Sequence, residues 1–232
     1  TVYVDVKSNV KSEIIQSDTT ICSYDSITLI AEGNKGSLYF DGIDDKIMVS
    51  NNPILQTSGN TTIEMWIKPM SFTTNSYLYK KALGGEGAIL LNTSGKLTYY
   101  YGTSGNQGTP GQSFTSNSAI SLNQWTHIAI VRDTVNMKLY WYINGNLDKE
   151  GTANYSYGKK TNYPVYFGSY STTNYYKGYI DEIRIWNKVL SVSEIQEHLD
   201  NQIIPSEITG LVAYWQIDEM TGDTVRDKIY NL

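Results

Sequence analysis

Two adjacent acidic residues, Asp181 and Glu182, lie inside the strand-like segment 177–186, and a pair of carboxylates could act as general acid and base or hold a metal ion. Catalysis of the retaining glycosidase type needs two carboxyl groups about 5 Å apart in one cleft. Side chains that follow one another along a strand point to opposite faces of the sheet. If Ile183 faces the core, Asp181 shares that face, and Glu182 lies on the other face, where it can pair with Arg184. The spacing therefore disfavours catalysis by this pair.

Other sequence patterns that carry catalysis are absent. Asp148 and Glu150 follow a hairpin turn without a third acid, so they do not form the alternating acids that some glycan hydrolases carry on one strand. His127 and His198 have no nucleophile-elbow sequence near them, and the chain contains no H-E-x-x-H, P-loop or G-x-G-x-x-G pattern. We therefore expect a protein that is not an enzyme.

Three aspartates, Asp41, Asp44 and Asp45, crowd a turn between two strand-like segments. Gly42 lets the backbone bend there, so that carboxylates and carbonyl oxygens can converge, as the oxygen ligands of Ca²⁺ must. The alternative is an Asp-Gly turn in which the aspartate side chains cap backbone amides. The residues alone leave both interpretations open.

Two polar segments, 99–118 and 153–178, are rich in tyrosine and are predicted to be loops. A tyrosine ring can cover the apolar C–H side of a sugar, while nearby amides and hydroxyls bond to the sugar hydroxyl groups. The alternative is that these loops are solvated connections whose rings pack on the edges of the fold. The candidate ligand-binding residues are Tyr101, Asn106, Gln107, Tyr155, Tyr157, Tyr163, Tyr170 and Tyr175.

Composition and charge exclude several classes of partner. The net charge is −5 and no run of Lys or Arg is longer than a pair, so we expect no nucleic-acid binding. No apolar run approaches the roughly 20 residues of a membrane helix, so we expect no membrane insertion. The first residues, TVYVDVKSNV, contain neither an initiator Met nor an apolar signal-peptide core. We expect a part of a longer protein that is secreted or displayed at the cell surface.

The elements that position these residues are predicted to be strands. From Ser37 onward, short segments of alternating apolar and polar residues follow one another, separated by turn-forming residues. No helical segment is long enough to link neighbouring parallel strands. The sequence therefore predicts an all-β chain folded as an antiparallel β-sandwich, or jelly roll, with one short helix on its C-terminal side. The dipeptide Asn144-Gly145 predicts a tight hairpin turn in this sandwich.

The helix and the domain limits also follow from local sequence. Ser191 and Glu194 have the spacing of a capping box, at the start of a helix that ends around 200–201. Residues 37–232 are predicted to form the sandwich, including a final strand at 211–217. Residues 1–36 are interpreted either as the last strands of a preceding immunoglobulin-like module or as an extra edge of the sandwich.

Several segments together resemble laminin G-like domains of the concanavalin A-like lectin superfamily, in particular the bacterial LamG-like jelly rolls. The segments that carry the resemblance are LYFDGIDDKIMV (38–49), TIEMWIKP (62–69), NQWTHIAIVRD (123–133), LYWYINGNL (139–147) and GYIDEIRIWNKVLSVSEI (178–195). The last segment is also distantly similar to pentraxins, which bind calcium through acids in the loop before that strand. Because 169–178 contains no acid, we do not expect the pentraxin site here.

The resemblance implies a structural calcium ion. In LamG-like domains the F-D-G-x-D-D turn and the acid of the D-E-x-R-I strand lie close together, often around such an ion, so its candidate ligands are Asp41, Asp44, Asp45 and Asp181. The resemblance also implies a carbohydrate-binding or adhesive module whose partner is a glycan or polysaccharide. The alternative is a structural spacer repeat of an adhesin, or one that binds a surface protein. A glycan hydrolase or lyase is less favoured.

Overall fold

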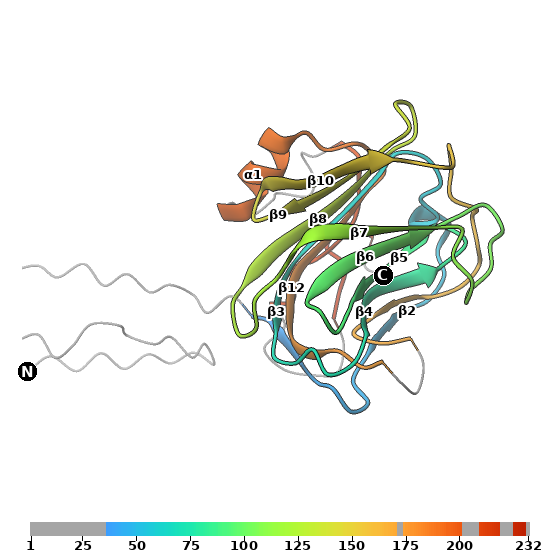
Figure 1. The fold of residues 1–232 in the computed structure, drawn as a ribbon. Helices are drawn as coiled ribbons and strands as arrows, with labels where there is room; N and C mark the ends of the chain where they lie inside the picture. Colours follow the sequence, from blue (N-terminus) through green and yellow to red (C-terminus); the bar gives the residue numbers. More distant parts are fainter. Residues whose placement is uncertain (1–35, 171–173, 201–208, 219–224, 231–232) are drawn as a thin grey trace, which may run out of the picture.

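The computed structural model describes residues 36–170, 174–200, 209–218 and 225–230. These residues form two sheets that lie face to face, with one α-helix on the outer side (Figure 1). All strand pairings in both sheets are antiparallel. The predicted fold class, an antiparallel β-sandwich with one short helix, is confirmed.

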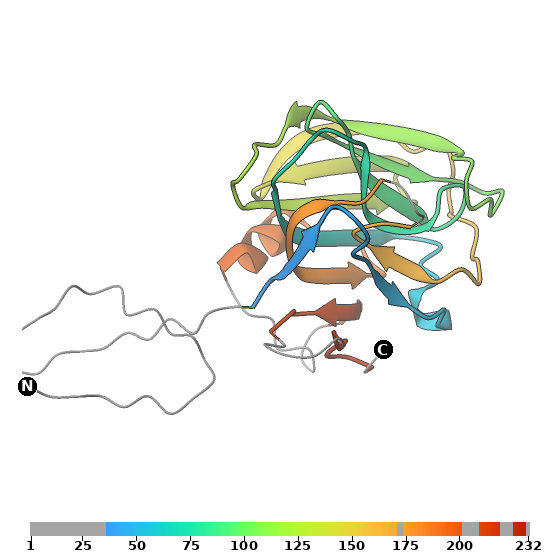
Figure 2. The same ribbon diagram turned by 90° about the horizontal axis from the view of Figure 1, so that it is seen from below.

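The seven-stranded sheet, here called the front sheet, has the strand order β1-β12-β3-β8-β9-β10, with β13 paired to β12. Its strands are β1 (Leu38–Asp41), β3 (Thr61–Pro69), β8 (Thr126–Asp133), β9 (Lys138–Ile143), β10 (Asn146–Thr152), β12 (Lys177–Trp186) and β13 (Leu211–Trp215). Figure 2 shows β13, in red, beside β12. The last long strand of the sheet thus lies between strands from the beginning of the described chain.

The six-stranded sheet, here called the back sheet, has the order β2-β11-β4-β5-β6-β7. Its strands are β2 (Ile47–Val49), β4 (Ser76–Ala82), β5 (Gly87–Leu91), β6 (Lys96–Tyr101), β7 (Gln112–Ala119) and β11 (Val165–Phe167). A short 3-10 helix, Pro53–Leu55, follows β2. Because β1 belongs to the front sheet and β2 to the back sheet, the turn that joins them crosses from one layer to the other.

The inner faces of both sheets bury one hydrophobic core, because apolar residues alternate along the strands. On β9, Leu139 and Trp141 enter this core, whereas Tyr140 lies on the outer face. The turn after β9 has φ values of 48° at Asn144 and 71° at Gly145, the left-handed conformation that a tight hairpin turn requires. The predicted hairpin is therefore confirmed.

The helix α1 (Val192–Asp200) packs on the outer face of the front sheet, beside the β9–β10 hairpin (Figure 1). Its capping box is formed: the Ser191 hydroxyl accepts from the Glu194 amide at 3.2 Å, and the Glu194 carboxylate accepts from the Ser191 amide at 2.7 Å. The Gln196 side chain donates to the Gly145 carbonyl at 3.1 Å. The helix therefore rests on the hairpin turn.

A β-bulge breaks the alternation of side chains along β12. Glu182 has a φ of 52°, and the register with β3 shifts after Asp181, so that two residues of β12 face one residue of β3. As a result Ile180 and Ile183 both enter the core. Asp181 is paired with Trp66 and lies on the outer face of the front sheet. The prediction that Asp181 shares the core face with Ile183 is wrong because of this bulge.

Two strands were not predicted from the sequence. Part of the segment interpreted as a loop, 99–118, forms β7 at the edge of the back sheet, and β10 follows the hairpin turn. Both strands are rich in polar residues, and in β7 the apolar Phe114 reaches the core while its neighbours Ser113 and Thr115 do not. Edge strands of this kind lack the apolar alternation that marks central strands.

The structure covers only part of the segments predicted at the two ends of the chain. The strand predicted at 211–217 corresponds to β13, which pairs with residues 183–186 of β12. Apart from Gly36, the segment 1–36 lies outside the described residues, so the domain limits remain a prediction. In the part of the chain that the structure describes, none of the helices is long and apolar enough to cross a membrane.

Candidate functional site

A buried polar cluster lies on the outer face of the front sheet, beneath α1. Glu64 has no exposed surface, and its Oε1 accepts hydrogen bonds from the Trp186 indole at 3.0 Å and from His198 Nδ1 at 2.9 Å. Arg184 Nη1 lies 3.6 Å from the same oxygen, and His127 Nε2 lies 3.6 Å from the other oxygen. The cluster joins β3, β8 and β12 to the helix.

Burial and charge set the protonation of this cluster. Burial alone would raise the pKa of Glu64, but the hydrogen bond from His198 and the positive charge of Arg184 hold this pKa below its ordinary value. Burial lowers the pKa of His127 to about 4. At neutral pH, therefore, the His127 ring is neutral and Glu64 is an anion paired with Arg184.

The acids of β12 are bound within the protein. Glu182 forms an ion pair with Arg184 and accepts a hydrogen bond from the Tyr214 hydroxyl at 2.6 Å. This confirms the predicted pairing of Glu182 with Arg184. Asp181 is buried, and its Oδ1 accepts from the Glu182 amide at 2.8 Å. Glu182 thus links β12 to β13, Asp181 bonds to the backbone of its own strand, and both carboxylates are buried.

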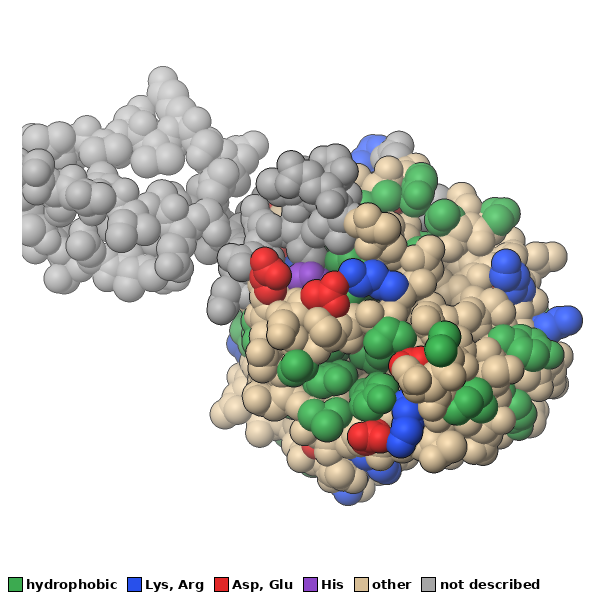
Figure 3. Space-filling view, turned by 90° about the horizontal axis from the view of Figure 1, so that it is seen from above, with side chains coloured by type: hydrophobic (Ala, Val, Ile, Leu, Met, Phe, Trp, Pro, Cys, Tyr) green, Lys and Arg blue, Asp and Glu red, His purple; other side chains and the backbone are tan. Residues whose placement is uncertain are grey.

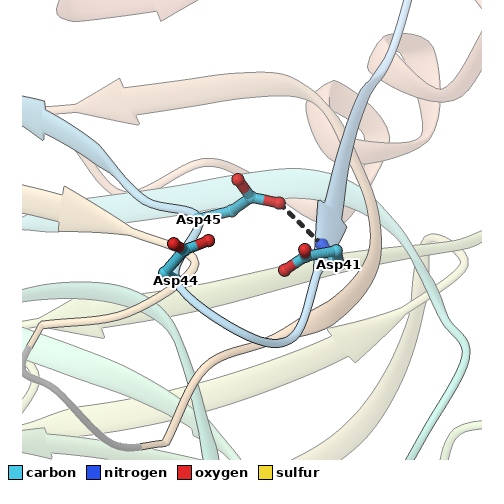
Figure 4. A group of neighbouring side chains, drawn as sticks. All are labelled: Asp41, Asp44 and Asp45. Atoms are coloured by element: carbon cyan, nitrogen blue, oxygen red, sulfur yellow. Dashed lines mark hydrogen bonds between the residues drawn. The ribbon is translucent and has the colours of Figure 1, made fainter.

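The aspartate turn between β1 and β2 gathers three carboxylates, those of Asp41, Asp44 and Asp45 (Figure 4). Their ligand oxygens lie within 4.8 Å of one another. Asp41 Oδ1 accepts from the Ile43 amide at 2.7 Å, and Asp45 Oδ2 accepts from the Asp41 amide at 2.8 Å. The turn thus contains the hydrogen bonds of the capping alternative.

The same turn has the oxygen ligands that calcium prefers. Two carboxylate oxygens are used by the capping bonds, and the others are available to a cation. Among the described residues, no Lys, Arg or His forms an ion pair with Asp41, Asp44 or Asp45. Three carboxylates this close repel one another, so a bound cation would relieve the repulsion. The residues present therefore fit a calcium ion.

Asp181 does not lie in the aspartate turn. The register of β1 with β12 places Asp41 opposite Lys177, four residues before Asp181. At about 3.3 Å per residue, Asp181 lies on the order of 13 Å farther along the strand. The predicted grouping of Asp181 with the other three aspartates is corrected by this register.

One predicted ligand-binding residue is inside the core. Tyr101 has no exposed surface, stacks on Tyr99 with ring centroids 5.7 Å apart, and donates its hydroxyl to the Tyr155 carbonyl at 3.1 Å. The role predicted for Tyr101 is therefore wrong. Tyr101 is the last residue of β6, and alternation along this strand sends it inward.

The other predicted residues are distributed over the surface. Tyr155 is half-buried against Tyr101, and the Asn106 side chain accepts from the amides of Gly108 and Thr109 within its own loop. Tyr157 and Tyr163 are 47% and 36% exposed. Gln107 and Tyr175 are partly exposed. The structure does not gather these residues into one site.

Tyr170 belongs to a different group, on the outer face of the back sheet. Its ring packs edge-on against Tyr77, with centroids 6.5 Å apart, and against Tyr166, at 5.7 Å. Tyr100 lies beside them, near enough to influence the pKa of Tyr77. All four rings are partly exposed. We call this surface of Tyr77, Tyr100, Tyr166 and Tyr170 the tyrosine face.

The register of the back sheet builds the tyrosine face as a row of side chains. Tyr166, Lys80, Ala88 and Tyr100 are paired in succession across four neighbouring strands. Directly paired residues share one face of a sheet, so this row points away from the core. In the described structure, none of the four tyrosine hydroxyls of the face forms a hydrogen bond.

The opposite outer surface has a different character. Figure 3 shows the molecule from the side of α1 and the β9–β10 hairpin, where hydrophobic side chains are spread over the middle of the view and acidic and basic groups lie among and around them. Tyr140 and Tyr142 belong to this surface, and the exposed pair Lys138–Glu150 lies beside them. This surface supplies a control residue, Tyr140, for the tests of the tyrosine face.

Sequence reasoning missed Tyr77, Tyr100, Tyr166 and Lys80. In β6 the alternation of Leu97, Tyr99 and Tyr101 into the core places Tyr100 on the other face, so the pattern itself could have identified it. For Tyr77 the signal is weaker, because register shifts in β4 interrupt the alternation. The packing of Tyr170 on these strands depends on a contact between distant segments that no local pattern predicts.

The sequence matches the family model Laminin_G_3, described as the concanavalin A-like lectin/glucanases superfamily, over residues 40–196. No curated protein sequence matches the chain.

Similar solved structures share the sandwich fold. One is a candidate carbohydrate-binding protein from Bacteroides ovatus, with a TM-score of 0.64 and 16% identity; the match covers 82% of this chain and 56% of that protein. Another is domain 4 of an extracellular GH43 arabinanase from Geobacillus stearothermophilus in complex with arabinotriose, with a TM-score of 0.55, 24% identity, and coverage of 75% and 81%. A third is the CBM40 of a sialidase from Ruminococcus gnavus bound to α2,3-sialyllactose, with a TM-score of 0.52, 15% identity, and coverage of 67% and 96%. At these identities the likeness shows the fold.

Proposed function

The chain belongs to the concanavalin A-like lectin/glucanase superfamily, and on this basis we propose that it is a non-catalytic carbohydrate-binding or adhesive module of a larger extracellular or cell-surface bacterial protein. The observation that carries the proposal is the tyrosine face. Partly exposed rings whose hydroxyls make no hydrogen bond to described residues offer both parts of a sugar site: apolar surface for the C–H side of the ring and donors for its hydroxyl groups.

Two of the similar structures support this proposal through their ligands. The arabinanase domain was solved with arabinotriose, and the sialidase module was solved with sialyllactose. Both have the sandwich fold of this chain, so the fold is compatible with glycan binding. Three of the rings of the tyrosine face, Tyr77, Tyr100 and Tyr166, stand on strands of the back sheet, which position them more rigidly than loops would.

The proposal is tested with a glycan array that includes neutral and acidic oligosaccharides. We expect the domain to bind at least one glycan, and we expect Tyr100→Ala and Tyr166→Ala to lower the affinity about tenfold or more, since stacking and hydroxyl contacts of one ring contribute on the order of 1–2 kcal/mol. Tyr140→Ala on the opposite surface is the matched control and should leave binding unchanged.

Two results would contradict this function. A domain that is folded but binds no glycan on the array would favour the structural spacer of an adhesin. Binding that is retained in Tyr100→Ala and Tyr166→Ala but lost in Tyr157→Ala or Tyr163→Ala would move the site from the tyrosine face to the loops at 153–178.

We also propose that the aspartate turn binds a structural calcium ion through Asp41, Asp44 and Asp45. The support is the convergence of the three carboxylates without a cationic partner in the described residues. When bound, the ion would neutralise charge at this turn and would hold the ends of β1 and β2 together. The proposed role of the ion is to stabilise the fold.

A further inference from the structure

Lys80 is a buried cation that forms no ion pair with any residue the structure describes. The residue is 1% exposed, although it lies on the outer face of the back sheet. Its Nζ lies 3.1 Å from the centroid of the Tyr170 ring and 4.9 Å from that of Tyr77. It makes no hydrogen bond or ion pair with any residue that the structure describes. The ammonium is therefore held by ring faces alone, which is an incomplete environment for a desolvated charge.

The environment of Lys80 differs from that of its neighbour. Lys81 donates to the Asn51 side chain at 3.0 Å and to the Tyr163 carbonyl at 2.7 Å, and it lies 3.9 Å from Glu86. Burial alone lowers the pKa of Lys80 to about 8. Lys81 is thus satisfied within the fold, whereas none of the three donors of Lys80 finds a hydrogen-bond acceptor among the described residues.

The back sheet as a whole has the opposite charge to the chain. The net charge of the chain is −5. The six strands of the back sheet contain Lys80, Lys81 and Lys96 but no Asp or Glu. An anion that approaches the tyrosine face therefore meets no carboxylate on these strands.

We propose that the tyrosine face recognises an acidic sugar, such as a uronic or sialic acid, and that Lys80 binds its carboxylate. This inference rests on the proposed glycan-binding function and specifies its ligand class. A carboxylate only accepts hydrogen bonds, and each polar group of the face can donate to it: the ammonium of Lys80 and the hydroxyls of Tyr77, Tyr100, Tyr166 and Tyr170. The flexible stem of Lys80 lets the ammonium turn from the Tyr170 ring toward the ligand.

The test compares sugars that differ only in charge. Isothermal titration would measure the binding of trigalacturonic acid against its methyl ester, and of 3′-sialyllactose against lactose. In at least one pair, we expect the acid to bind about tenfold tighter than the neutral sugar, because a hydrogen bond to a charged group adds to affinity by about this factor. The advantage should shrink with added salt.

Variants assign the preference to Lys80. Lys80→Met keeps the length of the side chain and removes the charge, and it should abolish the preference for the acid over the neutral sugar. Lys96→Met removes a charge from the same sheet without contact to the tyrosine face, and the preference should remain. A thermal melt of each variant verifies folding.

Each outcome separates the two proposals. Equal binding of acid and neutral sugar, or a preference that survives in Lys80→Met, overturns the acidic-sugar inference and leaves glycan binding intact. If neither member of either pair binds and the array is also negative, the proposed function and this inference both fail.

Discussion

Glu64 shows how a single buried charge can organise one side of the molecule. Its carboxylate binds Trp186 and His198 and lies close to Arg184, so β12 and α1 both contact this one residue of β3. Such a cluster is costly to form but also costly to break, because removing one partner leaves an uncompensated charge. Glu64 therefore stabilises the packing of α1 on the outer face of the front sheet.

His127 gives this cluster a predictable dependence on pH. Its pKa is lowered by burial from 6.5 to about 4, so the unfolded chain takes up a proton between these values that the folded protein does not. Stability should therefore fall as the pH drops from 6.5 toward 4, by on the order of 3 kcal/mol for this residue. Urea unfolding at pH 7.0 and pH 4.5 measures the change.

Comparing the pH dependence of stability in the wild type and in His127→Gln separates the contribution of His127 from that of other titrating groups. The variant has no proton to gain, so its unfolding free energy should decline less between the two pH values than that of the wild type. Equal declines in the two proteins would show that His127 does not carry the effect.

At the scale of elements, local sequence predicts the turns and helix caps whose geometry depends only on residues close together in the chain. The hairpin at Asn144-Gly145 and the capping box of Ser191 and Glu194 both form as expected, because their geometry is set within a few residues. Tyr101 was placed wrongly because β6 extends farther than its polar surroundings suggest. A prediction that carried the alternation of β6 through to Tyr101 would have found the tyrosine face at Tyr100.

The bulge at Glu182 and the position of Asp181 could not be predicted in this way. A strand that pairs with two neighbours takes its register from both, and the φ of 52° at Glu182 has no signal in the local residues. The resemblance to LamG-like domains suggested that Asp181 approaches the aspartate turn, but the pairing of Asp41 with Lys177 keeps the two apart. The pairing of β12 with distant strands determines both the bulge and the position of Asp181.

The capping box of α1 yields a prediction about the helix. Ser191→Ala removes the acceptor for the Glu194 amide, so it should destabilise the protein by about 1 kcal/mol. The measurement is the unfolding free energy from denaturant titration.

Ser193→Ala is the control for this helix, since Ser193 is exposed in the same turn. Its effect should remain within about 0.5 kcal/mol. Equal effects of the two substitutions would argue that the cap does not contribute to stability.

At the scale of the whole molecule, the aspartate turn links the two sheets. Because β1 belongs to the front sheet and β2 to the back sheet, an ion bound between them would stabilise the sandwich as a unit. Saturating calcium should raise the melting temperature by roughly 5–10 °C over that in chelator, as expected for a ligand at about 100 times its Kd. Differential scanning calorimetry measures this shift.

Two variants test whether the calcium ligands lie in the aspartate turn and exclude Asp181. Asp45→Asn should remove most of the calcium-dependent shift, whereas Asp181→Asn should retain it, whatever its own stability. A melting temperature that is the same with calcium and with chelator would contradict the calcium site.

The strand order of the front sheet has a consequence for how the protein is made. The strand β12 lies between β1 and β3, although it is far from both in the sequence. During synthesis, β1 and β3 emerge from the ribosome long before the strand that joins them, and their edges stay unpaired until β12 arrives. Contacts of such high sequence separation slow folding and expose nascent strands to aggregation. The sheet is therefore completed late, when almost the whole described chain has been translated.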